Sequence, residues 1–285
     1  MIGQDRWIDI GLQLHVREWP GDKVSFVLLH GLSSNCRTWE MVAARLAAAG
    51  HHVVTVDQRG HGLSDKPATG FDFATVTADL ARLLLALQLE QPIVVGQSWG
   101  GNVVLEFGVR YPDLARGLGF VDGGFLDHQA RPNPTWEAVS TELRPPDLDG
   151  MPRESLKRRL QEAHPDWSEE GLEATLANFE TLPDGTIRRW LDIPYHMLIL
   201  RAMWEQRPPE LYPQVTKPVL ICVADSGDAW TEHKRKLVAA AEAGLPRREV
   251  HWFSATDHDI HIHRPDELAE LFLQAVEGEI WGPNS

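Results

Sequence analysis

The sequence has little cysteine and no long hydrophobic run. Only two of its 285 residues are cysteine. Cys222 lies within an apolar run and Cys36 just before an expected helix, and neither belongs to a Cys-x-x-Cys pair. We therefore expect two free thiols rather than a disulfide. No apolar stretch approaches the ~20 residues that a membrane-spanning helix needs, so a membrane span is not expected.

Basic residues are scarce relative to acidic ones. The chain has 27 Lys and Arg against 41 Asp and Glu, a formal net charge of −14. Such a balance argues against nucleic acid and anionic membrane surfaces as partners. The first seven residues lack the basic segment and apolar stretch of a secretory signal. We expect a cytoplasmic protein whose partner is a small-molecule substrate, and the composition leaves its oligomeric state open.

Strand-like and helix-like segments alternate along most of the chain. Alternating apolar residues in 6–19 predict a hairpin around Gly11. The further expected strands are 24–29, 53–56, 93–95, 118–121, 219–223 and 250–253, and the expected helices are 38–49, 75–89, one after Ser98, 231–243 and 265–276. This alternation predicts a parallel sheet with helices on both faces. Residues 281–285 are expected to form a loose tail.

The alternation stops between residues 125 and 214. This segment is rich in Pro, Arg, Glu, Trp and Met, with expected helices near 153–163, 168–179 and 194–206 and no expected strand. We predict a core domain of residues 1–124 and 215–285 with a helical insertion, 125–214, between its two parts. Its large apolar residues are expected either to wall a substrate pocket or to form the insertion's own core. These residues are Trp136, Trp167, Trp190, Met197, Met203 and Trp204.

A serine stands between an expected strand and an expected helix. The run Gly96-Gln97-Ser98-Trp99-Gly100 follows the strand directly. In that context Gly-x-Ser-x-Gly is typical of a nucleophile elbow, a sharp turn that raises the serine hydroxyl above the sheet. The alternative is a glycine-rich turn with an incidental serine. Other parts of the sequence must therefore supply the rest of a catalytic site.

A serine nucleophile needs a base, which is usually a histidine oriented by a carboxylate. His258 follows the last expected strand, so it lies at the sheet edge where the loops converge. The neighbouring His261 and His263 could suggest a metal site, but no partner motif accompanies them. We interpret these two as polar contacts in the loop, and we expect neither a metal nor a cofactor.

Three aspartates are candidates for the carboxylate. Asp225 and Asp228 follow the strand 219–223, and Asp122 follows the strand 118–121. Each could instead be an ordinary helix cap or turn residue.

The oxyanion formed in acyl transfer needs backbone donors. The amide of Trp99 is one candidate donor. The second is the amide of Leu32, in the loop after the strand that ends at Leu29. His30 is expected to orient that loop.

With these residues placed, the chain resembles the α/β-hydrolase fold superfamily along nearly its whole length. The matching motifs are His30-Gly31, the segment 57–64 (DQRGHGLS), the elbow 96–101 (GQSWGG) and His258 seven residues before Pro265. The resemblance implies an eight-stranded, mostly parallel sheet with a helical cap inserted after strand six. It also implies that Asp57 and Arg59 are structural.

The resemblance orders the three candidate acids. The family usually carries Gly-x-x-Asp after strand seven, and here the aspartate comes one residue late. Asp228 is the first choice on this ground, because a loop readily absorbs one extra residue. Some members, including certain haloalkane dehalogenases, take the acid from the end of strand six, which makes Asp122 the alternative. Asp225 ranks third.

Serine at the elbow indicates a hydrolase that acts on an ester, lactone or thioester through an acyl-enzyme on Ser98, and we expect its substrate to be small and apolar. Within this family, dehalogenases and epoxide hydrolases use aspartate at the elbow. Cofactor-free perhydrolysis and carbon–carbon bond hydrolysis use the same triad and stay as alternatives. A ligand-binding receptor of this fold with slow turnover is the hypothesis from a different class.

Overall fold

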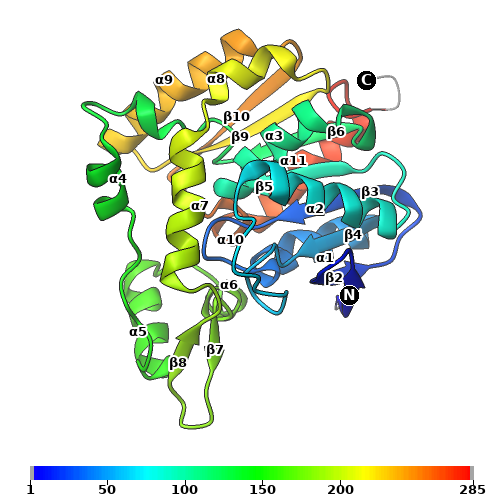
Figure 1. Cartoon of the computed structure of the whole chain (residues 1–285). Helices are drawn as coiled ribbons and strands as arrows, with labels where there is room; N and C mark the ends of the chain where they lie inside the picture. Colours follow the sequence, from blue (N-terminus) through cyan, green and yellow to red (C-terminus); the bar gives the residue numbers. More distant parts are fainter. Residues whose placement is uncertain (1–2, 283–285) are drawn as a thin grey trace.

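The computed structural model describes residues 3–282, and an eight-stranded sheet forms its centre (Figure 1). Along the sheet the strand order is β1-β2-β4-β3-β5-β6-β9-β10. The strands are β1 (Gln4–Asp9), β2 (Gln13–Trp19), β3 (Lys23–Leu29), β4 (His51–Val56), β5 (Ile93–Gln97), β6 (Gly117–Val121), β9 (Val219–Asp225) and β10 (Arg248–Ser254). The first two form the predicted antiparallel hairpin, β2 is also antiparallel to β4, and all remaining neighbours are parallel. The predicted eight-stranded, mostly parallel sheet is confirmed.

Helices cover both faces of the sheet. On one face, α1 (Glu40–Ala48) and α11 (Pro265–Glu277) pack Leu46 and Phe272 into one apolar cluster. On the other, α2 (Phe73–Ala86), α3 (Trp99–Arg110) and α9 (Ala229–Gly244) contribute to a second cluster. The strands between them are buried on both sides, and all five residues of β6 are buried, which explains why they read as continuous apolar runs.

The prediction of a loose C-terminal tail is wrong at Trp281. This side chain is fully buried, and its ring lies 6.2 Å from that of Phe26 and 5.6 Å from that of Phe272. Burial of so large an aromatic surface holds the end of the chain against the sheet. Residues 283–285 lie outside the described part of the chain.

The segment 125–214, called the cap below, lies to one side of the sheet (Figure 1, green to yellow). It contains η3 (His128–Ala130), α4 (Trp136–Glu142), α5 (Arg153–Ala163), α6 (Glu169–Leu176), β7 (Phe179–Thr181), β8 (Ile187–Arg189), α7 (Ile193–Glu205), α8 (Pro208–Leu211) and η4 (Tyr212–Gln214). The three expected helices are present as α5, α6 and α7.

The remaining short helices of the core are η1 (Cys36–Trp39), η2 (Pro112–Leu114) and α10 (Ile260–His263). Within the described residues, no helix is long and apolar enough to cross a membrane.

The prediction that the cap contains no strand is wrong. Strands β7 and β8 pair antiparallel around the turn Pro183-Asp184-Gly185. Gly185 has a φ of 81°, and the Asp184 side chain accepts a hydrogen bond from the amide of Thr186 at 2.9 Å. Pro-Asp-Gly is a turn signal in its own right, but the flanking strands have only three residues each, too few to show an alternating pattern.

Candidate active site

Ser98 occupies the sharp turn between β5 and α3. Its backbone has φ 52° and ψ −120°, a conformation that costs energy for any residue with a side chain. The turn closes because its flanking residues are glycines: a Cβ on Gly96 would overlap the carbonyl of Gly100, and a Cβ on Gly100 would lie 2.6 Å from the His30 oxygen. The Ser98 amide donates to the Val121 carbonyl at 2.9 Å, which anchors the turn to β6. The geometry expected of a nucleophile elbow is therefore present.

His258 lies in the loop between β10 and α10 and is paired with Asp122. The His258 Nδ1 and an Asp122 carboxylate oxygen are 2.6 Å apart. Burial lowers the pKa of His258, but the hydrogen bond to Asp122 and its negative charge raise it more, so the net shift is upward. About half of the His258 side chain is exposed, and its Nε2 has no hydrogen-bond partner among residues 3–282. Nδ1 of His258 is thus hydrogen-bonded to Asp122, and Nε2 remains free to bind another group.

Asp122 is fully buried where β6 ends, in an unusual backbone conformation. Its φ is 42°. The amide of Ala224 donates to one carboxylate oxygen at 3.0 Å. The ammonium of Lys234, from α9, lies 3.1 Å from both oxygens and also donates to the Ala224 carbonyl. The carboxylate thus has hydrogen bonds from a strand and a helix in addition to His258.

Of the three candidate acids, the structure pairs the second choice, Asp122, with His258 and not the first choice, Asp228. Asp228 is the N-cap of α9, where its carboxylate accepts a hydrogen bond from the Thr231 amide at 2.8 Å. Asp225 accepts from the Gly227 amide and forms an ion pair with Arg235 at 2.9 Å. Neither pairs with His258, whereas the second candidate, Asp122, does. Both therefore have the cap and turn roles that such aspartates often have.

The two amides expected to bind an oxyanion flank the serine. Trp99 begins α3, whose first turn presents unpaired amides and the positive end of the helix dipole. Leu32 follows β3 and lines the same cavity as Ser98. Neither amide donates a hydrogen bond to another group within the described residues. Among the described residues both amides therefore lack an acceptor, and Leu32, but not Trp99, is one of the residues that line the cavity.

Two buried histidines hold the loop that carries Leu32. His30 Nδ1 contacts the Gly31 carbonyl at 2.7 Å, and its Nε2 accepts from the Gln58 amide at 3.1 Å. His61 Nε2 accepts from the Ser33 amide at 3.2 Å, and its ring stacks on Trp99. Burial lowers the pKa of both rings, so both stay neutral. The expected orienting role of His30 agrees with these contacts, and His61 shares it.

Ser98 and His258 line a cavity of about 180 Å³ with a mainly polar wall. Hydroxyl and amide groups come from the core loop after β3 and from the cap. The lining residues with polar side chains other than Ser98 and His258 are Ser33, Ser34, Thr38, Gln97, Thr175, Asn178 and Asp259. Asp259 accepts one long hydrogen bond, 3.3 Å from Gln97 Nε2, and burial raises its pKa. Such a cavity fits a small polar ligand.

The large apolar residues of the cap do not line this cavity, so the first of their two expected roles, a pocket wall, is not seen at Ser98. Met203 is buried in an apolar cluster that also holds core residues, and Trp167 stacks on His164 with its centroid 3.9 Å away. Trp136 and Trp204 pack together, and Trp190 lies under the ammonium of Lys66. These side chains pack the cap and its contacts with the core, which was the alternative interpretation.

The two histidines after His258 differ from each other. His263 accepts from the Asp257 amide at 3.0 Å and contacts Asp166 of the cap at 2.6 Å, so its expected polar contacts are present. His261 has no polar partner within the described residues and packs on Trp39. Burial lowers its pKa to about 3. This neutral, buried ring corrects the expectation of a polar contact.

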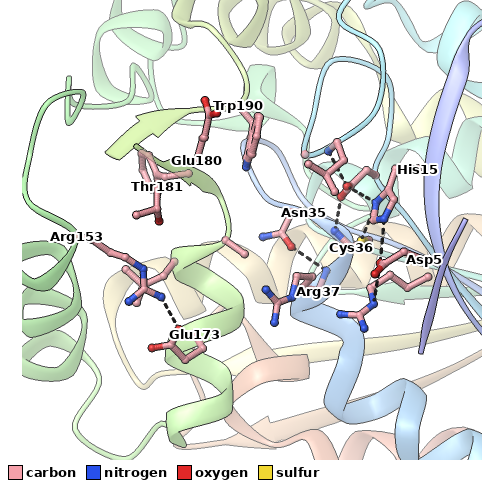
Figure 2. A pocket seen from close by; sticks show the side chains of 17 residues that line it. Asp5, His15, Asn35, Cys36, Arg37, Arg153, Glu173, Glu180, Thr181 and Trp190 are labelled. Atoms are coloured by element: carbon pink, nitrogen blue, oxygen red, sulfur yellow. Dashed lines mark hydrogen bonds and ion pairs between the residues drawn. The ribbon is translucent and has the colours of Figure 1, made fainter. Parts of the chain in front are cut away.

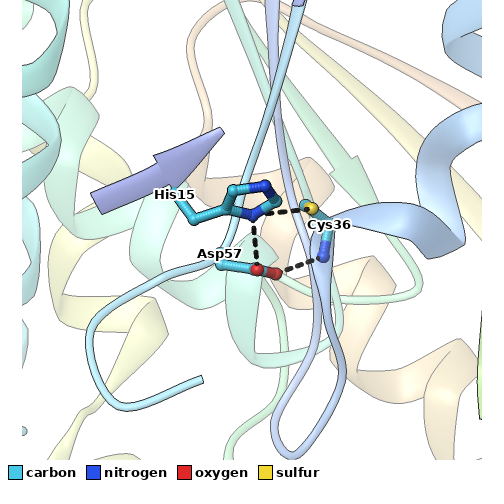
Figure 3. Close-up of side chains that lie close together, drawn as sticks. All are labelled: His15, Cys36 and Asp57. Atoms are coloured by element: carbon cyan, nitrogen blue, oxygen red, sulfur yellow. Dashed lines mark hydrogen bonds and ion pairs between the residues drawn. The ribbon is translucent and has the colours of Figure 1, made fainter. Parts of the chain in front are cut away.

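A different cluster has the residue types of a metal site. His15, Cys36 and Asp57 place one ligand atom each within 4.8 Å of the others (Figure 3). However, His15 Nδ1 is 2.8 Å from Asp57, a hydrogen-bond distance, and the Asp57 carboxylate accepts from the amides of Cys36 and Leu63. Burial raises the pKa of the Cys36 thiol well above its usual range. These hydrogen bonds account for the cluster without an ion, and they agree with the structural role expected for Asp57.

A larger cavity, of about 310 Å³, lies where the cap meets the core beside that cluster (Figure 2). Ser98 and His258 are not among its lining residues. Its arginines already have carboxylate partners: Arg153 pairs with Glu173, and Arg37 pairs with Glu40 at 2.8 Å. Since the charges are paired, the wall offers no free cation to an anionic ligand.

Sequence reasoning missed Lys234. The signal was present: α9 buries Thr231, Lys234, Leu237, Val238 and Ala241, so the lysine lies on the apolar face of an amphipathic helix. A lysine is almost never fully buried unless it is paired. A lysine on that face therefore indicates a buried carboxylate partner.

Comparison with known proteins agrees with the fold. A family model described as the alpha/beta hydrolase family matches residues 26–271. Among curated proteins, 2-(acetamidomethylene)succinate hydrolase of Mesorhizobium japonicum is 38% identical over 118 residues, 41% of this chain and 42% of that protein. A non-heme chloroperoxidase of Streptomyces lividans is 35% identical over 101 residues, 35% of this chain and 37% of that protein. These alignments span less than half the length of either relative.

Among solved structures, that of E-2-(acetamidomethylene)succinate hydrolase superposes with a TM-score of 0.81 at 25% identity. It covers 97% of this chain and 100% of that one. A thioesterase domain from the curacin biosynthetic pathway reaches a TM-score of 0.74 at 19% identity, a likeness of fold alone.

Proposed function

This chain belongs to the α/β hydrolase family, and we propose that it is a serine hydrolase acting on a small polar acyl compound through a Ser98–His258–Asp122 triad. The observation that carries the proposal is the His258–Asp122 hydrogen bond at 2.6 Å beside a strained Ser98, at the wall of one cavity. A serine with a neighbouring base and a buried orienting acid is the arrangement that acyl transfer needs.

In the proposed reaction, Ser98 Oγ attacks the carbonyl carbon while His258 Nε2 takes the hydroxyl proton. The oxyanion accepts hydrogen bonds from the amides of Trp99 and Leu32. Collapse of the intermediate transfers the proton from His258 to the leaving group and leaves an ester on Ser98. Water, deprotonated by His258, then cleaves that ester. Asp122 holds the imidazole in the tautomer that accepts a proton at Nε2 and stabilises the imidazolium.

The character of the cavity supports a polar substrate. Its wall carries hydroxyl, amide and carboxyl groups. Several of them already have a partner in the protein, as Ser33 has His196 at 2.7 Å and Thr175 has the Gly171 carbonyl at 2.9 Å, and each hydroxyl oxygen keeps capacity for a further hydrogen bond to a ligand. The apolar cap residues that favoured an apolar substrate lie elsewhere. We propose a small ester, lactone or thioester with polar groups on both sides of the reacting carbonyl.

A second candidate reaction is the hydrolysis of an amide, and Asp259 favours it. This carboxyl group lies at the cavity wall beside His258 with only one long hydrogen bond from the protein. It has capacity to accept a hydrogen bond from a substrate N–H. The partial similarity to 2-(acetamidomethylene)succinate hydrolase, whose name includes an acetamido group, lends this candidate further support.

The test is a substrate panel of short esters, thioesters, lactones and N-acyl amides, each with polar and apolar versions. We expect turnover of polar members, and Ser98→Ala should reduce kcat by on the order of 10⁴- to 10⁶-fold. Ser140→Ala is the matched control, because within residues 3–282 the one hydrogen bond of the Ser140 hydroxyl goes to the Glu137 carbonyl. Turnover that survives Ser98→Ala would refute the proposal.

The panel also separates the remaining alternatives. Labelling of Ser98 by a fluorophosphonate without turnover of any member would favour a slow ligand-binding receptor. Faster turnover of amides than of esters, lost in Asp259→Leu, which removes the acceptor, would favour the second candidate. Carbon–carbon cleavage and perhydrolysis are checked by adding a β-diketone and by supplying hydrogen peroxide to an ester reaction.

A further inference from the structure

The acid of the proposed triad shares a buried ion pair with a lysine from a different element. Lys234 and Asp122 are 2% and 0% exposed. The ammonium lies 3.1 Å from each carboxylate oxygen, so it is bidentate on the acid rather than a distant charge. Taking two charges out of water costs free energy, and this cost is offset only by good geometry and further hydrogen bonds. Here the Ala224 amide and carbonyl supply them, one to each partner.

We propose that Lys234 is a positioning residue of the active site: its ammonium holds the Asp122 carboxylate in the orientation that receives His258 and balances its buried charge. This inference rests on the proposed function for its effect on rate. With the lysine present, the resting set of Asp122, Lys234 and neutral His258 has no net charge. The set acquires one positive charge only when His258 takes the serine proton.

The lysine also affects the pH range in which His258 can act as a base. Burial lowers the pKa of His258, Asp122 and Asp259 raise it, and the positive charge of Lys234 lowers it. The buried His261, from α10, also faces His258 and is neutral. Loss of the Lys234 charge leaves the two carboxylates to act on the imidazole with less opposition. His258 would then bind its proton more tightly and be available as a base only at higher pH.

The experiment compares Lys234→Met, which keeps the length of the side chain and removes the charge, with Arg235→Met. Arg235 is the next residue on α9 and pairs with Asp225 and Glu232. Arg235→Met therefore also removes one positive charge from α9, but at a residue that does not pair with Asp122. The His258 ring is titrated by NMR, its signals assigned by their loss in His258→Gln, and kcat/KM is measured against pH. In Lys234→Met we expect the pKa of His258 and the acidic limb of kcat/KM to rise by about one unit. At pH values below this limb, kcat/KM of Lys234→Met should therefore be about tenfold lower than that of the wild type. Arg235→Met should move neither value.

The possible results separate the two proposals. An unchanged or lowered pKa of His258 in folded Lys234→Met overturns the role of Lys234. A raised pKa without a shift of the kcat/KM limb leaves the coupling intact but contradicts His258 as the base, and so the proposed function. Should Lys234→Met not fold, Lys234→Gln retains a donor for the Ala224 carbonyl and repeats the test. Failure of both to fold would assign the lysine to folding and refute a positioning role.

Discussion

Two buried aspartates of this protein have similar surroundings and different consequences. Asp57, after β4, and Asp122, after β6, each accept a backbone amide hydrogen bond and each contact the Nδ1 of a histidine. Both ring nitrogens of His15, the histidine paired with Asp57, already have partners: Nδ1 contacts Asp57, and Nε2 contacts Asp5 at 3.0 Å. The side chain is also buried, at 2% exposed. The histidine of Asp122 leaves its Nε2 open to the cavity. An aspartate–histidine pair therefore indicates chemistry only where the second ring nitrogen is left for a substrate.

The balance of charge also differs between these two regions. Asp57 is paired with His15. Burial raises the pKa of Asp57, but the hydrogen bond from His15 and the charges that His30 and His15 carry once protonated at low pH lower it far below its usual range. Asp122 has a permanent cation, Lys234, as well as its histidine. The first arrangement stabilises a loop. The second allows the histidine to change protonation while the acid keeps a partner.

The largest expected effect is on activity and belongs to the Asp122 region. Asp122→Asn should lower kcat by about 10⁴-fold, because an amide can hold the imidazole in the wrong tautomer. It should also destabilise the fold, since Lys234 is left without its buried partner. Adding Lys234→Met is expected to restore stability in urea unfolding while kcat stays low. Recovery of kcat in the double variant would show that Asp122 does not act on His258.

Asp228→Ala is the matched control for the acid. It removes the N-cap of α9 and should cost about 1 kcal/mol in the free energy of unfolding. Activity per folded molecule should remain within a few-fold of the wild type. A loss close to that of Asp122→Asn would reinstate Asp228 as the acid.

The next effect is on stability and belongs to the Asp57 region. Asp57→Asn should lower the free energy of unfolding by about 3 kcal/mol, because its NH₂ group faces a backbone donor and His15 loses its charged partner. Urea unfolding followed by circular dichroism measures the change. We expect kcat at a temperature where the variant is folded to stay near the wild-type value. An equally large loss of kcat would mean that the two regions are not separable.

The smallest expected effect is seen in the wild-type protein. Activity, which depends on the Asp122 region, and stability, which depends on the Asp57 region, should respond to different ranges of pH. The pKa of His258 is raised above its ordinary 6.5, so the base is lost as pH falls through that raised value. The pKa of Asp57 is lowered below its ordinary 3.8, so its stabilising contribution is present above that pH and is lost only as pH falls further. As pH is lowered from 8 we therefore expect activity to fall first, through the raised pKa of His258. The buried neutral His30, His61 and His261 cost stability only below their ordinary pKa of 6.5. Thermal unfolding and kcat/KM across this range check it, and unfolding that coincides with loss of activity would contradict it.

The features that the sequence predicted well are local ones. The elbow could be read from five residues because glycine spacing and a strand–helix context lie side by side in the chain. His258 could be placed because it follows the last strand. The parallel sheet could be predicted because its strands are continuous apolar runs, as expected for strands that are buried on both faces.

The acid could not be chosen by the same means. Three aspartates follow strands at the correct edge of the sheet, and the sequence does not say which of them faces His258. That depends on the path of β6 beside β9 and on the φ of 42° at Asp122. The wall of the cavity was missed for a related reason: which cap residues reach Ser98 is decided by how the cap packs, and its tryptophans pack elsewhere.

The position of Asp122, the acid of the proposed triad, at the end of β6 has a consequence for how this scaffold can be altered. The connection from β9 to α9, residues 226–228, then contains no member of the proposed triad. Helix α9 is docked by its own buried face, including Leu237 and Val238, so Lys234 does not depend on the length of that connection. Gly227 has open space around it, since a Cβ at this position would meet no atom within 4 Å, but its φ of 72° favours glycine, so an insertion should leave Gly227 itself in place. This short loop is therefore a permissive place for an inserted peptide, a reporter or new termini, at a sheet edge where an insertion would ordinarily abolish activity.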